Sequence, residues 1–294
     1  MGQHSTWQVQ VRPAKKALAW PFVRLRSLPE TGVGMRTEFR TKKHLGQHFL
    51  KDPNVIGSIL DAINPGQEES IIEIGPGDGA LTEGLIMRSG MVYAIDVDNE
   101  AVAYLENRFS DKKNFQLIHR SVLDVDLSGI AKMPKARMVG NLPYNLSSPI
   151  LFHLLRHLAA MKDIYIMVQR EVAERIIAQP GNRDYGRLSL GIQLQCHAEK
   201  LFDVGPHAFI PPPRVWSSVV RLVPRAEKEL TVDPVSFQKL VRQAFTHRRK
   251  KLKNNLKKIE GIEDFLAKAG IDAEQRPEQI SLDQYIRLTE ALYG

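Results

Sequence analysis

The sequence of 294 residues contains one cysteine, Cys196. It also has no run that approaches the roughly 18 uncharged apolar residues needed for a membrane-spanning helix, which excludes such a span. A single cysteine excludes a disulfide framework and a metal site built from cysteines alone, and it favours a reducing compartment, so we expect a cytoplasmic protein. Cys196 itself lies in an apolar stretch and is most simply a buried small hydrophobic side chain.

Acidic residues are scarce in two segments of the chain. Residues 1–45 carry nine basic side chains and two acidic ones, and residues 242–258 carry eight basic side chains and none acidic, within a net charge of +8 for the whole chain. The remainder is therefore mildly acidic. Two concentrated basic segments indicate a polyanionic partner rather than a generally basic fold.

Residues 1–34 show no sustained apolar periodicity and contain Pro13, Pro21 and Pro29. We predict an N-terminal extension outside the fold. Its arginines are compatible with an organellar presequence, whereas its prolines oppose the amphipathic helix of such a signal. An extension ahead of a natural start at Met35 is an equally good interpretation.

From about residue 53 the pattern alternates between helical periodicity and short apolar runs. Strands separated by helices indicate a Rossmann-like α/β domain with a mostly parallel sheet, whose ligands lie at the carboxyl ends of the strands. Beyond about residue 230 only helical patterns remain, so we expect a catalytic domain at 35–228 and a small C-terminal all-helical domain at 229–294. The expected helices are 55–63, one from 80, 100–109 and 149–158, and the expected strands are 70–74, 91–95, 115–119, 137–139, 164–168 and 217–223.

A glycine-rich turn joins the first of these strands to the next helix. It contains Gly75 and Gly77, with Glu73 inside the strand and Asp96 at the end of the following strand. Glycines let a backbone approach a ligand closely, and a carboxylate suits a ribose diol. The turn also fits a dinucleotide-binding fingerprint or a purely structural turn. Glu73 favours S-adenosylmethionine over NAD, because its position in the strand can reach the methionine part of that cofactor.

The strand at 137–139 runs into Asn141-Leu142-Pro143-Tyr144. This pattern suits methylation of an exocyclic amine, whose lone pair is delocalised into its ring. Hydrogen bonds from the amine to the Asn141 side-chain oxygen and the Leu142 carbonyl would localise that lone pair, while Tyr144 stacks on the base. No general base is required. The alternative is a turn in which Pro143 only ends a strand.

Five ordered blocks make the sequence resemble the small-subunit (16S) rRNA adenine N6,N6-dimethyltransferase family. The resemblance runs from about residue 40 to the C-terminus, and its blocks are residues 45–50, the turn at 73–77, residues 141–149, residues 209–217 and residues 245–256. It implies dimethylation of two adjacent adenines in the 3′-terminal hairpin of small-subunit rRNA, with S-adenosylmethionine, late in ribosome assembly. The expected partner is the small-subunit rRNA in a pre-30S particle, and the expected protein is a monomer.

The resemblance also implies roles for individual residues. His48, Leu50 and Gly75 would line the cofactor, Asp96 would hold its ribose, and Asn141 would touch both cofactor and target amine. The family commonly has Asn where this chain has His48, which keeps a hydrogen-bonding side chain. It commonly has Asp at the adenine-contacting position where this chain has Ser121, so either Ser121 or Asp124 makes that contact.

Phe209 stands directly before a proline-rich segment, Ile210-Pro-Pro-Pro213. The resemblance makes it the second face of a base sandwich with Tyr144, around an adenine taken out of its stack. Its alternative role is a core anchor at the domain junction. A proline-rich recognition motif for another protein is the weaker interpretation inside a folded domain.

The second basic segment follows a helix whose core face is marked by apolar spacing from Phe237 to Phe245. A basic segment without acidic residues favours contact with RNA phosphates. Such contacts provide affinity and position the protein on the RNA, but they do not select a base sequence. The predicted RNA-binding residues are Arg248, Arg249, Lys250, Lys251, Lys253, Lys257 and Lys258. Arg36, Arg40, Lys42 and Lys43 are further candidates that become ordered when RNA binds.

Rival interpretations remain at this point. His153 and His157 have the i, i+4 spacing of a zinc pair, but no third ligand is evident and we expect no metal. A large-subunit rRNA adenine N6-methyltransferase is disfavoured by the blocks at 209–217 and 245–256. An assembly or transcription factor that keeps the fold without the activity is disfavoured by the intact residues 141–144, and an NAD oxidoreductase requires those blocks to be coincidence.

Overall fold

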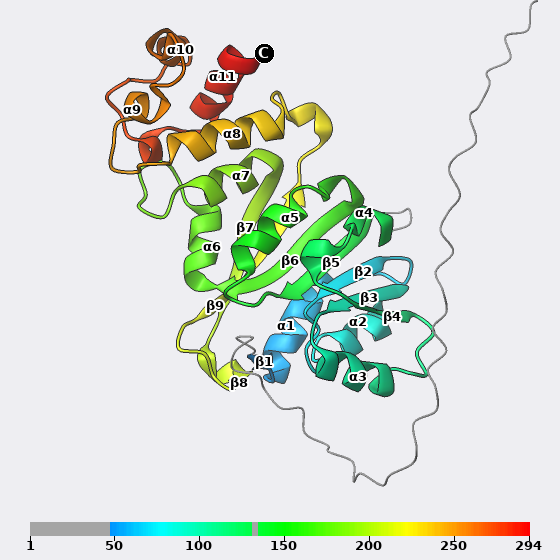
Figure 1. The fold of residues 1–294 in the computed structure, drawn as a ribbon. Helices are drawn as coiled ribbons and strands as arrows, with labels where there is room; N and C mark the ends of the chain where they lie inside the picture. Colours follow the sequence, from blue (N-terminus) through cyan, green and yellow to red (C-terminus); the bar gives the residue numbers. More distant parts are fainter. Residues whose placement is uncertain (1–47, 131–134) are drawn as a thin grey trace, which may run out of the picture. The chain divides into compact units, whose positions relative to one another are not determined.

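A central β-sheet with helices on both faces carries the site described below (Figure 1). The computed structural model describes residues 48–130 and 135–294. The strands are β1 (Phe49–Leu50), β2 (Ser70–Ile74), β3 (Met91–Asp96), β4 (Phe115–His119), β5 (Ala136–Asn141), β6 (Met161–Gln169), β7 (Cys196–Val204), β8 (Phe209–Ile210) and β9 (Ser217–Pro224). The α-helices are α1 (Pro53–Ile63), α2 (Thr82–Arg88), α3 (Asn99–Arg108), α4 (Leu127–Ile130), α5 (Ser147–Leu154), α6 (Arg170–Ile177), α7 (Arg187–Gln195), α8 (Pro234–Ala244), α9 (Leu252–Leu256), α10 (Ile262–Lys268) and α11 (Leu282–Tyr293).

The main sheet has the strand order β4-β3-β2-β5-β6-β9-β7. The first five strands in this order are parallel, and β9 is antiparallel to both of its neighbours. A separate antiparallel ladder pairs β1 with β8, with Leu50 opposite Phe209. The predicted Rossmann-like, mostly parallel sheet is confirmed, and the carboxyl ends of β2, β3 and β5 meet at one edge.

Alternating residues of the strands supply two hydrophobic cores. In β2, Ile71 packs with α1, α2 and α3, whereas Ile72 packs on the opposite face with α5, α6 and α7. In β6, Tyr165 packs on the same face as Ile71, and Ile166 packs on the same face as Ile72. Strands covered on both faces have near-continuous apolar sequences, which is why short apolar runs between helical patterns predicted this sheet.

A third hydrophobic core joins the C-terminal helices to the sheet domain. It contains residues of α8, α9, α10 and α11 together with Tyr185, Leu190 and Leu194, which belong to α7 and the turn before it. Residues on both sides of the predicted boundary at residue 229 therefore share one hydrophobic core, and the division into two domains stays a prediction. Arg36, Arg40, Lys42, Lys43 and the extension at 1–34 lie outside the described residues.

Local sequence signals determine where several helices begin. The Asp52 carboxylate accepts hydrogen bonds from the backbone N–H groups of Asn54 and Val55, and Pro53 occupies the first turn of α1. Asp233 and Pro234 start α8 in the same way. An acceptor side chain satisfies N–H groups that have no partner inside the helix, and proline has no N–H to lose there.

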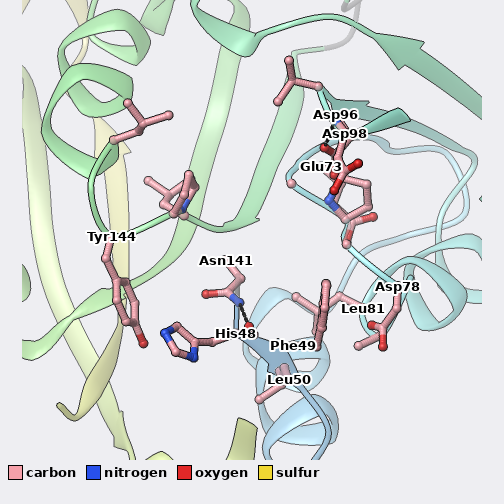
Figure 2. Close-up of a pocket in the computed structure, with 18 of the residues that line it drawn as sticks. His48, Phe49, Leu50, Glu73, Asp78, Leu81, Asp96, Asp98, Asn141 and Tyr144 are labelled. Carbon is pink, nitrogen blue, oxygen red and sulfur yellow. Dashed lines mark hydrogen bonds between the residues drawn. The ribbon is translucent and has the colours of Figure 1, made fainter. Parts of the chain in front are cut away.

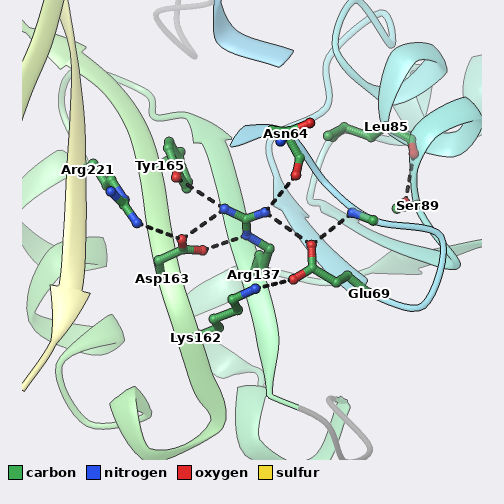
Figure 3. A network of polar contacts seen from close by, with 10 residues as sticks. Asn64, Glu69, Leu85, Ser89, Arg137, Lys162, Asp163, Tyr165 and Arg221 are labelled. Atoms are coloured by element: carbon green, nitrogen blue, oxygen red, sulfur yellow. Dashed lines mark hydrogen bonds and ion pairs between the residues drawn. The ribbon is translucent and has the colours of Figure 1, made fainter. Parts of the chain in front are cut away.

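A buried polar network lies at the amino ends of the central strands (Figure 3). The guanidinium of Arg137 in β5 donates to Asp163 in β6 through Nε and Nη2 at 2.8 and 2.9 Å. Its Nη1 donates at 3.1 Å to Glu69, which directly precedes β2. The network thus ties three parallel strands together at the edge opposite their carboxyl ends.

Two sequence expectations about composition can be compared with the structure. Cys196 is buried, and burial raises the pKa of its thiol to about 12, as suits a small hydrophobic side chain. Among the described residues, no helix has both the length and the apolar character required to cross a lipid bilayer.

Candidate active site

A pocket opens at the carboxyl edge of the sheet (Figure 2). Its walls come from β1, the turn after β2, the end of β3 and the segment after β5, which is where a doubly wound sheet binds ligands. Among the predicted site residues, it brings together His48, Leu50, Glu73, Gly75, Gly77, Asp96, Asn141, Leu142, Pro143 and Tyr144.

The glycine-rich turn has backbone conformations that only glycine adopts easily. Gly75, Gly77 and Gly79 have φ angles of 65°, 61° and 82°. At Gly77 an added β-carbon would lie 3.0 Å from the ring of Phe49, so the turn also leaves no room for a side chain there. The turn and strand β1 therefore form one continuous wall of the pocket.

Two carboxylates lie behind this turn. Glu73 is 2% exposed, and burial, with a smaller contribution from Asp96, raises its pKa to about 7. Its Oε2 has no hydrogen-bond partner among the described residues. Burial likewise raises the pKa of Asp96, although its Oδ1 accepts a hydrogen bond from the backbone N–H of Asp98 at 2.9 Å. Both groups are suited to accept donors from a bound ligand.

Glu73→Gln is expected to stabilise the cofactor-free protein at alkaline pH. Glu73 has a pKa of about 7 when folded and 4.5 as its ordinary value, so its ionisation opposes folding. The penalty is absent below about pH 4.5, grows as the pH rises, and levels off above 7 at about 3 kcal/mol. Urea denaturation of both proteins at pH 4 and pH 8 measures the difference.

The exposed neighbour Glu68 provides the control, and Glu68→Gln should change stability by less than about 0.5 kcal/mol at pH 8. Equal gains at pH 4 and pH 8 for Glu73→Gln would show that the buried carboxylate does not titrate as described. The same substitution should weaken cofactor binding, since it removes a charged acceptor from the pocket.

The side chain of Asn141 is held by strand β1. Its Nδ2 donates a hydrogen bond to the carbonyl of His48 at 3.2 Å. A carbonyl can only accept, so the amide group must face His48 with its nitrogen, and Figure 2 shows the Asn141 oxygen on the side of Tyr144. The backbone N–H of Leu142 donates to Met167 at 3.0 Å and anchors the following turn on β6.

The ring of Tyr144 is fixed at both its hydroxyl end and its face. Its hydroxyl is 2.8 Å from the hydroxyl of Ser217 at the start of β9. Its ring stacks on that of His48, with centroids 5.5 Å apart and an interplanar angle of 28°. The Nδ1–H of His48 in turn donates to the carbonyl of Pro211 at 2.7 Å. The Tyr144 ring is therefore held in a fixed orientation beside the Asn141 oxygen, and we call this ring the Tyr144 platform.

Three other predicted residues lie outside the pocket lining. Phe209 is 2% exposed and packs within the hydrophobic core on the α1 side of the sheet, not in the core shared with the C-terminal helices. The ring that contacts Tyr144 is that of His48 instead. Ser121 and Asp124 belong to the segment after β4, whereas Val97 and Asp98 occupy the rim beyond Asp96. Their roles in binding base and cofactor stay predictions.

Several lining residues escaped the sequence analysis: Phe49, Pro76, Asp78, Ala80, Leu81, Val97, Asp98, Asn145 and Leu146. All of them except Ala80 and Leu81 stand within two residues of a predicted one, so contiguity along the chain was the available signal for those seven. Asp78 forms an ion pair with Lys51 and thereby joins the glycine-rich turn to the segment after β1.

The basic segment differs from its sequence pattern in one respect. Acidic residues from farther along the chain reach it: Lys251 pairs with Glu274, and Lys253 lies 2.7 Å from Glu274 and 3.7 Å from Glu263. Arg248 donates to the carbonyl of Tyr185 at 3.0 Å. In the described chain no acidic side chain is within ion-pair distance of the other four: Arg249, Lys250, Lys257 and Lys258.

The two histidines with zinc-like spacing have protein partners. Nε2 of His153 donates to the carbonyl of Val125 at 3.1 Å, and His157 lies 3.1 Å from the hydroxyl of Ser128. Over residues 48–130 and 135–294, no group of three His, Cys, Asp or Glu side chains is placed to hold a metal ion.

The sheet, the glycine-rich turn with its two carboxylates, and the Asn-Leu-Pro-Tyr segment together define a Rossmann-like methyltransferase directed at an amine. Residues 38–293 match the family described as "Ribosomal RNA adenine dimethylase", and the chain belongs to this family. The predicted family and the predicted enzymatic class are thereby confirmed.

Individual relatives agree with the family assignment. The chain is 43% identical over 259 residues to "Ribosomal RNA small subunit methyltransferase A" of Pseudomonas putida, covering 87% of this chain and 96% of the relative. It is 41% identical over 256 residues to the protein of that name from Hahella chejuensis, covering 86% of this chain and 93% of the relative.

A solved structure supports the fold as well. The dimethyladenosine transferase of Plasmodium falciparum matches with a TM-score of 0.69 at 25% identity, over 82% of this chain and 96% of that one. The 23S rRNA methyltransferase ErmE matches with a TM-score of 0.64 at 24% identity, over 84% of this chain and all of that one. Because the curated relatives act on the small subunit, the large-subunit alternative is not favoured.

Proposed function

We propose that this protein dimethylates the N6 amino groups of two adjacent adenines in the 3′-terminal hairpin of small-subunit rRNA, with S-adenosylmethionine as methyl donor. The observation that supports it best is the fixed amide of Asn141, whose oxygen stands beside the Tyr144 platform within the pocket. The names of the small-subunit relatives supply the RNA class.

The residues of the pocket fit the proposed cofactor. Among residues 48–130 and 135–294, a buried carboxylate oxygen of Glu73 lacks a partner, and Asp96 stands at the end of β3 where a ribose diol is usually held. The glycine-rich turn offers a close backbone approach between these two carboxylates. When bound, S-adenosylmethionine supplies an electrophilic methyl group on its sulfonium.

The protein's own residues act on the adenine. The Asn141 oxygen and the Leu142 carbonyl would accept hydrogen bonds from the amine, drawing its lone pair out of the ring and opposing the positive charge that grows on nitrogen. The Tyr144 ring would hold the base by stacking. Transfer would form the new N–C bond as the methyl–sulfur bond breaks, and the amine proton would then pass to water, so no protein base is needed.

We further propose that the enzyme acts in the cytoplasm as a monomer on a pre-30S particle. Glu73, Asp96 and Asn141 come together in the pocket from three strands of this chain. Four basic side chains have no acidic partner within the part of the chain that the structure describes: Arg249, Lys250, Lys257 and Lys258. Together with Arg248 they are the best candidates for phosphate contact on the C-terminal helices.

Incubation with radiolabelled S-adenosylmethionine and small subunits from a strain lacking this methylation tests the proposal. We expect four labelled methyl groups per subunit, two on each of two adjacent adenines, located by primer extension and mass spectrometry of rRNA fragments. Large subunits are the control and should remain unlabelled. Absence of label from small-subunit rRNA, or label in large-subunit rRNA, would refute the proposed function.

A further inference from the structure

A second concave surface lies where the sheet domain meets the C-terminal helices. We define it as the junction groove; its lining residues are Phe152, Arg156, Arg187, Gly191, Val235, Phe237, Gln238, Lys239, Val241 and Arg242. They come from α5 and the turn after it, from α7 and from α8. It shares no lining residue with the active-site pocket.

Two helices each present a pair of groove residues at i, i+4 spacing, which places both members on one helical face. These pairs are Arg187 and Gly191 in α7 and Gln238 and Arg242 in α8, while Phe152 of α5 and Arg156 of the turn after it complete the lining. The floor is apolar, because Phe237 and Val241 are buried in the third hydrophobic core. At Gly191 an added β-carbon would lie 3.3 Å from the Phe152 ring, so α5 and α7 are in close contact there. The groove is thus built on packed helices.

The rim of the groove is strongly basic. Arg156, Arg187, Lys239 and Arg242 are all exposed, and no lining residue is acidic. In the described chain none of these four cations lies within ion-pair distance of a carboxylate, in contrast to Lys251 and Lys253. Arg156 contacts the ring nitrogen of His153 at 3.4 Å, and Lys239 stands 5.8 Å from the centre of the Tyr293 ring.

Two acidic residues that precede these cations in sequence, Asp184 and Asp233, are already engaged. Asp233, at the start of α8, accepts from the backbone N–H groups of Val235 and Ser236. Asp184 lies 3.7 Å from Arg183 and accepts nothing from Arg187. Four like charges around one concave surface repel one another unless an anion lies between them. The groove therefore carries positive charge that the described protein does not neutralise, as expected of a site that binds a polyanion.

We propose that the junction groove binds the phosphodiester backbone of the rRNA substrate, away from the methylated adenines. Several separated cations suit successive phosphates better than one small anion, and three are arginines, whose planar forks match phosphate oxygens. Helix α5 begins directly after the Asn141–Tyr144 segment and has eight residues, about 12 Å of rise, so one helix connects the pocket to the groove. The inference rests on the proposed RNA substrate but assigns a separate contact.

Neutralising one arginine from each side of the groove tests this proposal. In the full-length chain, Arg187→Gln with Arg242→Gln should weaken binding to under-methylated small subunits about tenfold at physiological salt. The slope of log affinity against log salt should become shallower by roughly 1.5, because two phosphate contacts are lost. Affinity for S-adenosylmethionine and the unfolding midpoint report that the pocket and the fold are intact.

A control of equal charge change uses Lys113→Gln with Lys268→Gln, two exposed lysines that lie outside the groove, one in each domain. It should change affinity less than twofold. Equal losses in both double variants, or an unchanged salt slope in the groove variant, would overturn the proposal. One further outcome would instead assign the groove to an acidic protein. In that case the groove variant keeps its RNA affinity, but polyglutamate no longer competes with RNA for binding to it.

Failure of this proposal is distinguishable from failure of the proposed function. Label transferred to small-subunit adenines by the wild-type protein reports the activity, whereas the difference between the two double variants in affinity reports the groove. An active enzyme whose groove variant binds subunits normally would refute only the groove.

Discussion

Asn141→Ala is expected to lower the single-turnover rate of methyl transfer by about 10²- to 10³-fold. The Asn141 oxygen is oriented by the bond from its Nδ2 to the His48 carbonyl, and alanine supplies neither the acceptor nor this anchor. The loss falls on the transition state because charge on the adenine nitrogen grows only as the methyl group arrives. Rapid-quench incorporation of labelled methyl groups at saturating substrate measures it.

Small-subunit binding by Asn141→Ala should stay close to that of the wild-type protein, since phosphate contacts lie elsewhere. The exposed residue Asn107 in α3 provides a matched control, and Asn107→Ala should retain full activity. Retention of more than a tenth of the rate by Asn141→Ala would contradict the assigned role. Loss of methyl transfer together with small-subunit binding would mean that Asn141 acts in RNA positioning instead.

Arg137→Ala is expected to reduce the free energy of unfolding by about 3–5 kcal/mol. The substitution leaves the Asp163 carboxylate, whose side chain is 3% exposed, without its two short hydrogen bonds, and Arg221 at 3.6 Å is the remaining cation beside it. It also removes the donor to the Tyr165 hydroxyl at 3.1 Å (Figure 3). Urea denaturation at pH 7 measures the loss.

The exposed residue Arg183, with 92% of its side chain accessible, is the control, and Arg183→Ala should change stability by less than about 0.5 kcal/mol. A loss below about 1 kcal/mol for Arg137→Ala would show that solvent replaces the network at little cost. Substitution of both Arg137 and Asp163 by apolar residues should recover part of the stability, because no unpaired charge is then buried.

The network also predicts a response to acid. Burial raises the pKa of Glu69, but Lys162, the Gly66 N–H and Arg137 outweigh it and hold the pKa at about 2, below the ordinary 4.5. A lowered carboxyl pKa stabilises the fold above about pH 4.5, and this contribution is lost as the pH falls toward 2. Arg137→Ala should therefore lose less stability between pH 5 and pH 3 than the wild-type protein.

Much of the sheet could be predicted from the sequence because its central strands are short apolar runs between helical patterns. The ranges 70–74 and 115–119 coincide with β2 and β4. Strand β7 was missed because it is an edge strand with charged residues such as Lys200 and Asp203 in its pattern. The β1–β8 ladder was missed because two residues per strand leave no periodic signal.

The candidate site was predictable wherever a residue's position follows from the strand that precedes it. Glu73, Asp96 and Asn141 each lie in or at the end of a parallel strand, so topology alone brings them together. Contacts between distant segments were not predictable: the stacking of His48 on Tyr144, the burial of Phe209, and the acids that reach Lys251 and Lys253 all depend on tertiary packing.

The ladder between β1 and β8 connects methyl transfer to a local equilibrium. Two residues pair on each side, and the N–H groups of Lys51 and Asp52 extend the contact to the carbonyl of Ala208. Leu50 and Phe209, which pair across the ladder, are 3% and 2% exposed, so core packing holds it as well as hydrogen bonds. Opening of the ladder would move the His48 carbonyl away from Asn141 and free that amide to rotate. The rate constant of methyl transfer would then be the intrinsic one multiplied by the fraction of molecules in which the ladder is closed.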